Sequence, residues 1–337
     1  MDRQFEGGAA FGETAEDREA FERERHRYAD EHHGPSLIEA IGERVDYALD
    51  QELFQRDPAF VARLMPVLDR LLAWFDAEVR DFENIPADGP CLLVGNHSGF
   101  MYIPDYWALL RRWVAERGPE APLYAMTYDI LFSIPGTAEL ARRVGAVPAT
   151  RANADRVLDA GLPLIVYPSG DAGALRPWTQ RNRVDLQRRT GFVKLALRHG
   201  VPVVPFVGHG SHDVVVVLAT RPRLARHLGL DRLRVNVWPL LLGAPFGVAP
   251  PLLPTLPLPA KVTVRVGDPI NWSQYGPEAV DDPVVVRHCY AEVLGRMQAD
   301  LDDLAAELPH PIATRASSAL RSAAGSVVGT GRSLIGR

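Results

Sequence analysis

The residue whose type and position most suggest chemistry is His97, which follows the apolar residues 92–94 and the pair Gly95-Asn96. This pattern predicts a buried strand that breaks at the glycine and delivers the histidine into a turn, ahead of a helix over residues 106–114. Open α/β sheets bind ligands outside the carboxyl ends of their strands, so a histidine there can act as a base. A histidine that only caps the turn fits the same pattern equally well.

Three further polar residues, Arg151, Asp171 and Arg176, also follow stretches with the pattern of strands. Alternating strands and helices are typical of βαβ units and a mainly parallel sheet. The carboxyl ends of parallel strands share one edge, so we expect these three side chains to converge with His97. The expected strands are 122–126, 146–149, 162–167 and 201–207, and the expected helices are 135–144, 155–160 and 191–199.

The expected fold class is α/β, with a mostly parallel central sheet flanked by helices and an N-terminal helical pair in front of it. The second helix of the pair begins at Asp57-Pro58, and its broad apolar stripe from Phe60 to Val79 can cover a sheet or lie on a bilayer. Covering the protein's own core is favoured. Later patterns predict an edge strand at 261–266 and a closing helix at 284–308.

The chain divides into four expected parts by charge and apolar content. Residues 1–33 are acidic and poor in apolar groups, so we expect them to be mobile. The helical pair occupies 34–82 and the α/β domain 83–310. Residues 311–337 are basic and expected to be disordered, with weak binding to anionic lipid heads as the alternative.

Composition narrows the classes of protein that fit. With 337 residues and 47% hydrophobic content the chain can bury a large core, and a net charge of -5 does not indicate nucleic-acid binding. Cys91 and Cys289 lie far apart in apolar patterns, which favours two core residues in a reducing compartment over a disulfide or zinc site. The start has no secretory pattern, and no uninterrupted apolar run reaches about 18 residues. We expect a cytoplasmic protein, peripheral on the inner face of the cell membrane.

Residues 237–260 are apolar yet contain seven prolines, which excludes a long helix. The sequence predicts an irregular loop that either packs on the domain as a lid or dips into a membrane interface. The second alternative is slightly favoured, because long apolar loops are unfavourable in water.

Four stretches within residues 80–210 together resemble the glycerolipid acyltransferase family, whose lysophospholipid acyltransferases move an acyl chain from a thioester carrier to a glycerol hydroxyl. Two positions depart from the family's pattern. Tyr102 stands where the histidine-x4-aspartate signature has its aspartate, and Ser169 replaces the glutamate of the third block. The four stretches are Asn96-His97-Ser98-Gly99 with a later aspartate, residues 145–151 ending at Arg151, residues 166–171 followed by Arg176-Pro177-Trp178, and residues 201–206.

The resemblance implies an acyltransferase that uses acyl-CoA or acyl carrier protein as donor, without a metal or organic cofactor. Its acceptor would be a lysophospholipid or a glycerol-phosphate-like hydroxyl compound. The resemblance also implies that His97 is the base and, because Tyr102 displaces the usual aspartate, that Asp105 is the partner of the histidine. The substrate-binding residues we expect are Asn96, Ser98, Gly99, Arg151, Tyr167, Pro168, Ser169, Gly170, Asp171 and Arg176.

The residue types also support this chemistry independently of the resemblance. A glycerol hydroxyl is a poor nucleophile at neutral pH, and a neutral imidazole can remove its proton as it attacks the thioester. A carboxylate on the other ring nitrogen fixes the tautomer and stabilises the imidazolium. Asp105 can do so only if residues 99–104 fold back, because eight residues along a helix would put it about 12 Å from His97. Backbone N–H groups near Ser98 and Gly99 are candidates for stabilising the oxyanion.

Residues 176–199 hold seven bases against Asp185 alone, and seven minus one leaves a local charge of +6. A solvated charged loop is one interpretation, and a phosphate site is the other. Arg151 and Arg176 are the best phosphate ligands because each follows a strand end. His209, His212 and Asp213 also follow a strand, where a polar loop is favoured over a metal site.

Two other functions fit the same residues. A hydrolase would use His97 to activate water and cleave acyl thioesters or esters. A non-catalytic lipid-binding protein would keep the fold, consistent with the displaced aspartate and the missing glutamate. A serine nucleophile is disfavoured, because no G-x-S-x-G elbow surrounds Ser98 or Ser169.

Overall fold

The computed structural model describes residues 53–99, 101–128, 130–133, 136–221, 223–224, 238–243, 245, 247–249 and 255–320. The acidic N-terminus at 1–33 and nearly all of the first helix of the expected pair lie outside these ranges. The same is true of residues 321–337 in the tail.

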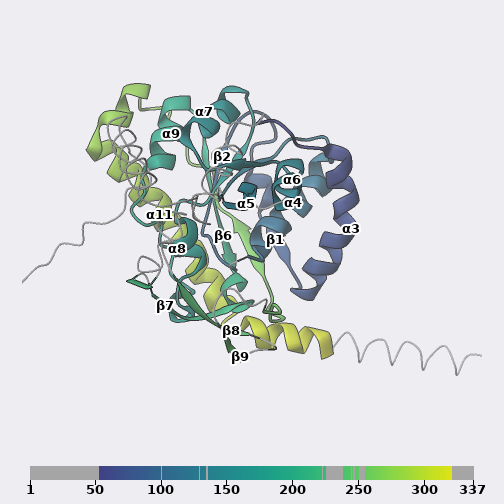
Figure 1. The fold of residues 1–337 in the computed structure, drawn as a ribbon. Coiled ribbons are helices and arrows are strands. Elements are labelled where there is room, and N and C mark those ends of the chain that lie inside the picture. Colours follow the sequence, from purple (N-terminus) through teal and green to yellow (C-terminus); the bar gives the residue numbers. More distant parts are fainter. Residues whose placement is uncertain are drawn as a thin grey trace, which may run out of the picture.

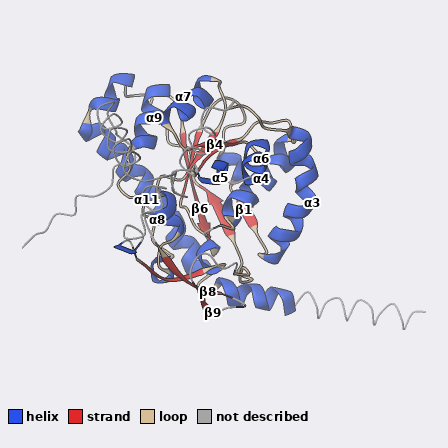
Figure 2. Cartoon of the chain, viewed as in Figure 1, coloured by secondary structure: helices blue, strands red, loops and turns tan. Residues whose placement is uncertain are grey.

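A seven-stranded sheet forms the centre of the fold (Figures 1 and 2). Its strand pairs are parallel except where β10 meets β6, so the expected α/β class with a mostly parallel sheet is confirmed. Across the sheet the strands are β1 (Glu78–Arg80), β10 (Thr263–Val266), β6 (Val203–His209), β2 (Leu92–Gly95), β5 (Leu164–Val166), β3 (Tyr124–Thr127) and β4 (Ala146–Pro148).

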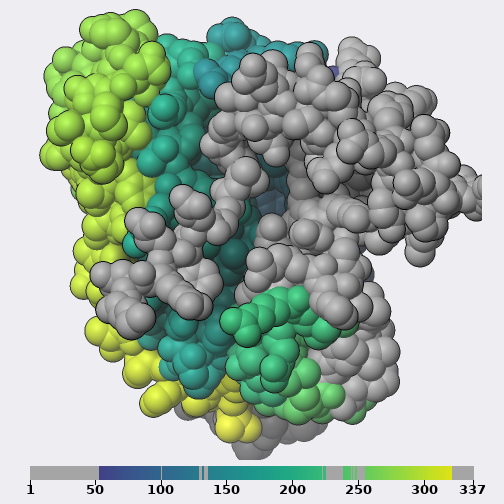
Figure 3. Space-filling model, turned by 60° about the vertical axis from the view of Figure 1, so that its left-hand side comes forward, coloured from purple at the N-terminus to yellow at the C-terminus, as the bar shows by residue number. Residues whose placement is uncertain are grey.

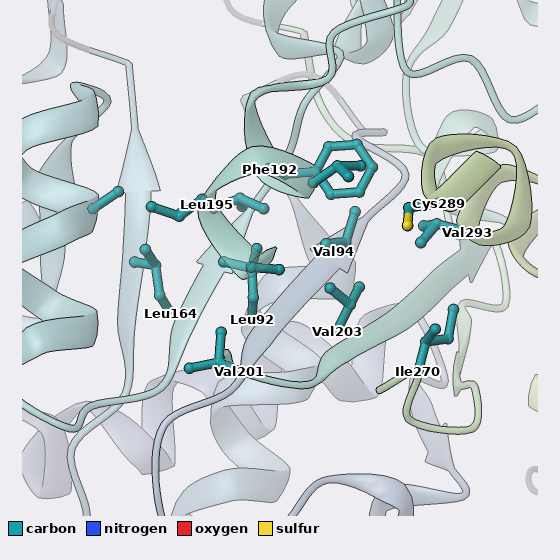
Figure 4. Packing of buried hydrophobic residues seen from close by; sticks show 14 of the residues in the cluster. Leu92, Val94, Leu164, Phe192, Leu195, Val201, Val203, Ile270, Cys289 and Val293 are labelled. Atoms are coloured by element: carbon teal, nitrogen blue, oxygen red, sulfur yellow. The ribbon is translucent and has the colours of Figure 1, made fainter. Parts of the chain in front are cut away.

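Alternate residues of β2 face two separate cores, as expected for a strand covered on both sides. Leu92 and Val94 pack with residues of the helices on one face, and Figure 4 shows them beside Phe192 and Val293. Leu93 belongs to the core on the other face. The first face is covered by α7 (Arg151–Asp159), α9 (Gly191–His199) and α11 (Pro283–Glu307), the second by α3 (Pro58–Trp74) and α4 (Pro104–Arg117).

The helix α3 begins as predicted. The Asp57 side chain accepts a hydrogen bond from the Phe60 amide at 2.9 Å, which caps the helix. Val61, Leu68 and Leu72 are buried, and the two leucines belong to the core on the face of the sheet that this helix covers. The helix ends at Trp74, however, and residues 78–80 at the end of the predicted stripe form β1.

Two predictions about the second half of the chain are wrong. The strand predicted as an edge strand at 261–266 is not at the edge, because β10 lies between β1 and β6. Residues 237–260 include two strands, β8 (Pro239–Gly243) and β9 (Gly247–Ala249), which form an antiparallel sheet with β7 (Val216–Thr220). Proline 239 is tolerated because it is the first residue of its strand.

The remaining elements are short, apart from a helix at 311–320, where disorder was expected. No helix in the described part of the chain is both long and apolar enough to span a bilayer. The short elements are α5 (Ile130–Ser133), α6 (Thr137–Arg143), α8 (Gly170–Ala174) and the 3-10 helices Phe82–Asn84, Trp178–Gln180, Ser211–Asp213 and Pro277–Asp281.

Leu241 and Leu242 of β8 are neighbours with opposite environments, the first fully buried and the second 40% exposed. We expect Leu241→Ala to lower the free energy of unfolding by about 2–5 kcal/mol, because it leaves a cavity in the core. Leu242→Ala should change it by about 0.5 kcal/mol, as is usual at a surface. Urea unfolding of both variants measures the difference, and equal losses would contradict the two-faced strand.

Candidate active site

The carboxyl ends of β2, β5 and β6 lie side by side, because β2 pairs in parallel with both of its neighbours. The loops that leave these ends carry His97, Tyr167 and His212. This edge is the one outside which open α/β sheets bind their ligands. The structure therefore places His97 where the sequence predicted it.

The His97 ring is partly exposed and lies at a tilt against Tyr167, with ring centroids 4.7 Å apart and an interplanar angle of 34°. Its Nδ1 atom is buried and has no hydrogen-bond partner among the described residues. Burial and the charge of nearby Arg176 lower the pKa of His97 to about 4. The imidazole is therefore neutral at pH 7, which is the form that a general base needs.

Asp105 is fully buried in the first turn of α4. The Tyr167 hydroxyl donates to its Oδ2 at 3.2 Å, while Oδ1 has no partner in the described structure. Burial raises the pKa of Asp105 to about 7. Tyr167 thus contacts both His97 and Asp105. A direct bond between those two residues stays a prediction, although Nδ1 of the histidine and Oδ1 of the carboxyl group are both buried and unpartnered.

The described part of the chain between His97 and Asp105 contains a turn. The Tyr102 amide donates to the Gly99 carbonyl at 3.1 Å, and α4 begins directly after Ile103, whose φ of 37° is rare for a β-branched residue. Asp105 therefore lies in the first turn of α4, two residues after Ile103. Tyr102, at the family's usual aspartate position, instead donates its hydroxyl to the Thr255 carbonyl.

Asn96 and Gly95 hold the end of β2 in place. The Asn96 side chain accepts from the Gly208 amide at 2.7 Å and donates to the Gly208 carbonyl at 3.3 Å, which joins the loop to β6. A Cβ atom at Gly95 would overlap the Phe206 ring and come within 2.6 Å of the Tyr167 ring. Glycine at this position therefore allows Tyr167 to pack against the strand.

Arg176 is only 3% exposed, and its Nη2 lies 2.7 Å from Nε2 of His212. Its Nε and Nη1 atoms are buried without hydrogen-bond partners among the described residues. Burial lowers the pKa of Arg176 to about 10, and burial together with Arg176 lowers the pKa of His212 well below its usual range. Neutral His212 thus accepts a hydrogen bond from a guanidinium that still has free donors.

Three buried serine hydroxyls have no hydrogen-bond partner in the described structure: those of Ser98, Ser169 and Ser211. Gly173 lies between Ser169 and His97, because a Cβ atom at this position would overlap the Ser169 hydroxyl and lie 3.6 Å from Cβ of His97. Glycine here therefore lets Ser169 and His97 lie close together. Buried polar atoms usually have partners, and a group of unpartnered ones near one histidine is typical of a site for a polar ligand.

The structure does not bring Arg151 to His97. Arg151 begins α7 after β4, the third strand from β2, which is a lateral distance of about 14 Å at about 4.8 Å per strand. Its side chain is 65% exposed and lies 3.8 Å from Asp155. The expected convergence failed here because β4 is the edge strand, a position that local sequence does not reveal.

The other predicted site residues belong to the loop after β5. The Pro168 carbonyl accepts from Arg189 at 3.1 Å, and the Asp171 side chain accepts from the Ala172 amide at 2.8 Å. Gly170 begins α8 with a φ of 55°. Their roles toward substrate stay predictions.

His212 and Ser211 were not among the predicted site residues. The glycine-flanked stretch from His209 to Asp213 was the available signal, but nothing in the sequence pairs His212 with Arg176. Within the described ranges, no three His, Cys, Asp or Glu side chains are grouped to hold a metal ion. His209 instead contacts the Leu308 carbonyl at 2.8 Å, and Asp213 accepts from the Trp178 indole at 2.9 Å.

Asp105→Asn should change how stability depends on pH. The pKa of this carboxyl group is about 7 in the folded chain and 3.8 in free solution, so between these values only the folded chain keeps the proton. The contribution of Asp105 to wild-type stability is therefore lost as pH rises through this window, by up to about 1.4 kcal/mol per pH unit, whereas asparagine cannot titrate.

The quantity to follow is the difference between the free energies of unfolding of wild type and of Asp105→Asn. We expect this difference, wild type minus variant, to fall from pH 4 to pH 7 and then to level off. Urea unfolding at a series of pH values measures this difference. A difference that does not vary with pH would show that the carboxyl group is ionised throughout.

The profile of the family described as Acyltransferase matches residues 76–208. An uncharacterized protein of Mycobacterium tuberculosis (strain H37Rv) is 33% identical over 260 residues, which cover 76% of this chain and 69% of that protein. Diacylglycerol O-acyltransferase 2 of Homo sapiens is 34% identical over 104 residues, 30% of this chain and 27% of that enzyme. The crystal structure of the 1-acyl-sn-glycerophosphate (LPA) acyltransferase PlsC from Thermotoga maritima aligns with a TM-score of 0.46 and 19% identity, covering 72% of this chain and 79% of that one. The chain belongs to the glycerolipid acyltransferase family.

Proposed function

We propose that this protein transfers an acyl group from acyl-CoA or acyl carrier protein to a hydroxyl of a lysophospholipid or glycerol-phosphate-like acceptor. The observation that carries the proposal is a neutral His97 near a buried Arg176 whose Nε and Nη1 atoms have no hydrogen-bond partner among the described residues. The first group can accept a proton, and the second can hold negative charge.

The proposed reaction is a single displacement at the thioester carbonyl. His97 removes the proton of the acceptor hydroxyl as its oxygen forms a bond to the carbonyl carbon. The carbon–sulfur bond then breaks, and the imidazolium returns its proton to the leaving thiolate. The products are an ester and a free thiol, so neither an oxidant nor a cofactor is required.

Asp105 and Tyr167 support the positive charge that forms on His97 in this scheme. An ionised Asp105 stabilises an imidazolium, and its pKa of about 7 leaves it partly ionised at neutral pH. The tyrosine hydroxyl holds one carboxyl oxygen and leaves the other available. Asp105 would then act by stabilising and orienting the histidine ring.

Arg176 supplies fixed positive charge to an acceptor phosphate in the proposal. Its guanidinium is held at one end by His212, so the Nε and Nη1 donors have a defined direction. Bidentate contact to phosphate suits this planar group. Because such an acceptor resides in a lipid bilayer, peripheral attachment to the inner face of the cell membrane is part of the proposal.

His97→Ala should lower the rate of acyl transfer by about 10²–10⁴-fold, the usual contribution of a general base. Thermal melting should hardly change, because the ring lies in a loop at the sheet edge. His288→Ala, which removes an exposed histidine on α11, is the matched control and should keep the wild-type rate. A His97→Ala enzyme that retains more than about a tenth of the rate would exclude His97 as the base.

The assay incubates acyl-CoA with the enzyme in the presence and absence of lysophospholipid. A transferase produces acylated lipid only when the acceptor is present. A hydrolase would release free fatty acid at the same rate with or without it, and that result would replace the proposed function.

Arg176→Ala should raise the KM for a phosphate-bearing acceptor more than the KM for the acyl donor, because a ground-state contact to phosphate is lost. Arg151→Ala is the control: its exposed side chain at the far edge of the sheet should leave both constants unchanged. Equal increases for both substrates in Arg176→Ala would indicate that the arginine has a structural role. Initial rates over a range of each substrate give the two constants.

A further inference from the structure

The small sheet formed by β7, β8 and β9 is apolar on both faces. On the inner face, the cross-strand partners Val217 and Leu241 are buried. On the outer face, Leu242 pairs with Val216 on one side and with Val248 on the other, so the three lie in one row. Leu242 is 40% and Val248 57% exposed. A solvated sheet face normally carries polar residues, but these strands contain no charged residue.

Two further exposed apolar residues connect this face to the loop that carries His97. The Tyr102 hydroxyl donates to the Thr255 carbonyl, and a Cβ atom on Gly243 at the end of β8 would lie 2.8 Å from Cβ of Thr255. Met101 precedes the tyrosine and Leu256 follows the threonine, and their exposed fractions are 58% and 64%. We call Leu218, Leu242, Val248, Leu256 and Met101 the outer apolar surface.

The sequence segments that contain most of this surface, or follow it in the chain, are rich in arginine. Residues 214–260 contain five arginines and one aspartate, and residues 309–337 contain four arginines and no acid, in a protein whose net charge is -5. Residues 258–261 join the two segments: the Leu258 amide donates to the Val214 carbonyl, and the Lys261 amide donates to the Pro311 carbonyl. The helix at 311–320 therefore starts near the small sheet (Figure 1).

We propose that the outer apolar surface docks on a bilayer that contains anionic lipid, and that this contact places the His97 crevice at the membrane. Arg221 directly follows β7 and is exposed, and Arg315 lies on the helix at 311–320. Apolar side chains beside such cations suit an interface in which acyl chains lie beneath anionic head groups. Figure 3 shows the small sheet, in green, at the surface of the molecule. The choice of a membrane rests on the proposed function, in which the acceptor is a lipid.

Flotation with vesicles of three parts phosphatidylcholine to one part phosphatidylglycerol tests the docking. The double variant Leu242→Ser/Val248→Ser removes the centre of the surface, and we expect its vesicle partition coefficient to fall at least tenfold. The control Val67→Ser/Val284→Ser changes residues that are 56% and 64% exposed on α3 and α11. The control should stay within twofold of wild type.

Three results would overturn the proposal: wild-type protein that does not float, a Leu242/Val248 variant that floats as well as wild type, or a control that loses binding equally. A wild-type dimer that this variant converts to a monomer without loss of flotation would also overturn it, because the surface would then join two copies. If the variant unfolds, Met101→Ser/Leu256→Ser tests the same surface outside the strands and should also float at least tenfold less.

The failure of docking can be separated from failure of the proposed function. The Leu242/Val248 variant should keep the wild-type rate with a soluble short-chain donor and acceptor, since neither residue belongs to the site at His97. Loss of flotation in this variant, together with no transfer activity in wild type, would remove the proposed reaction and leave the docking surface supported.

Discussion

The candidate site depends on the parallel pairing of β2 with β5 on one side and β6 on the other. Parallel strands bring three loops that are distant in sequence to one edge, and residues 97, 167 and 212 meet there because each follows one of these strands. The two hydrogen bonds between Asn96 and Gly208 fix the loop after β2 against β6. A shift of one residue in this register would turn the strand's side chains to opposite faces, so the cores on both faces also hold the site in place.

Burial and the charge of Arg176 together lower the pKa of both histidines at this edge. The buried Arg176 guanidinium has no carboxylate ion-pair partner among the described residues, which is costly, and its charge disfavours further positive charge on both nearby histidines. Negative charge is favoured at the same place. A base that is neutral at rest and a fixed positive charge are therefore adjacent, which suits a reaction in which an uncharged hydroxyl and a thioester pass through an oxyanion.

Local periodicity was enough to predict the strands that become β2 to β6, because each is a short apolar run bounded by turn residues. Local periodicity did not predict β1 or β8, because pairing with distant strands determines their structure. The sequence of β1 continues an apolar stripe with a helical period, and the prolines around β8 are typical of a loop. At the candidate site, His97 and Asp105 could be proposed from one loop and the family resemblance, and their catalytic roles stay predictions. The exclusion of Arg151 and the inclusion of His212 could not, because both depend on strand order across the sheet and on contacts between residues far apart in sequence.

The opposite pKa shifts of His97 and Asp105 also bear on stability. Between pH 4 and 6.5 the unfolded chain protonates the histidine while the folded chain does not, so this group adds stability as pH rises. Over nearly the same range the folded chain keeps the Asp105 proton that the unfolded chain releases, so this group removes stability as pH rises. The two slopes have opposite signs and offset each other. The fold can therefore keep a neutral base beside a carboxyl group of raised pKa without a steep dependence of its stability on pH from these two residues.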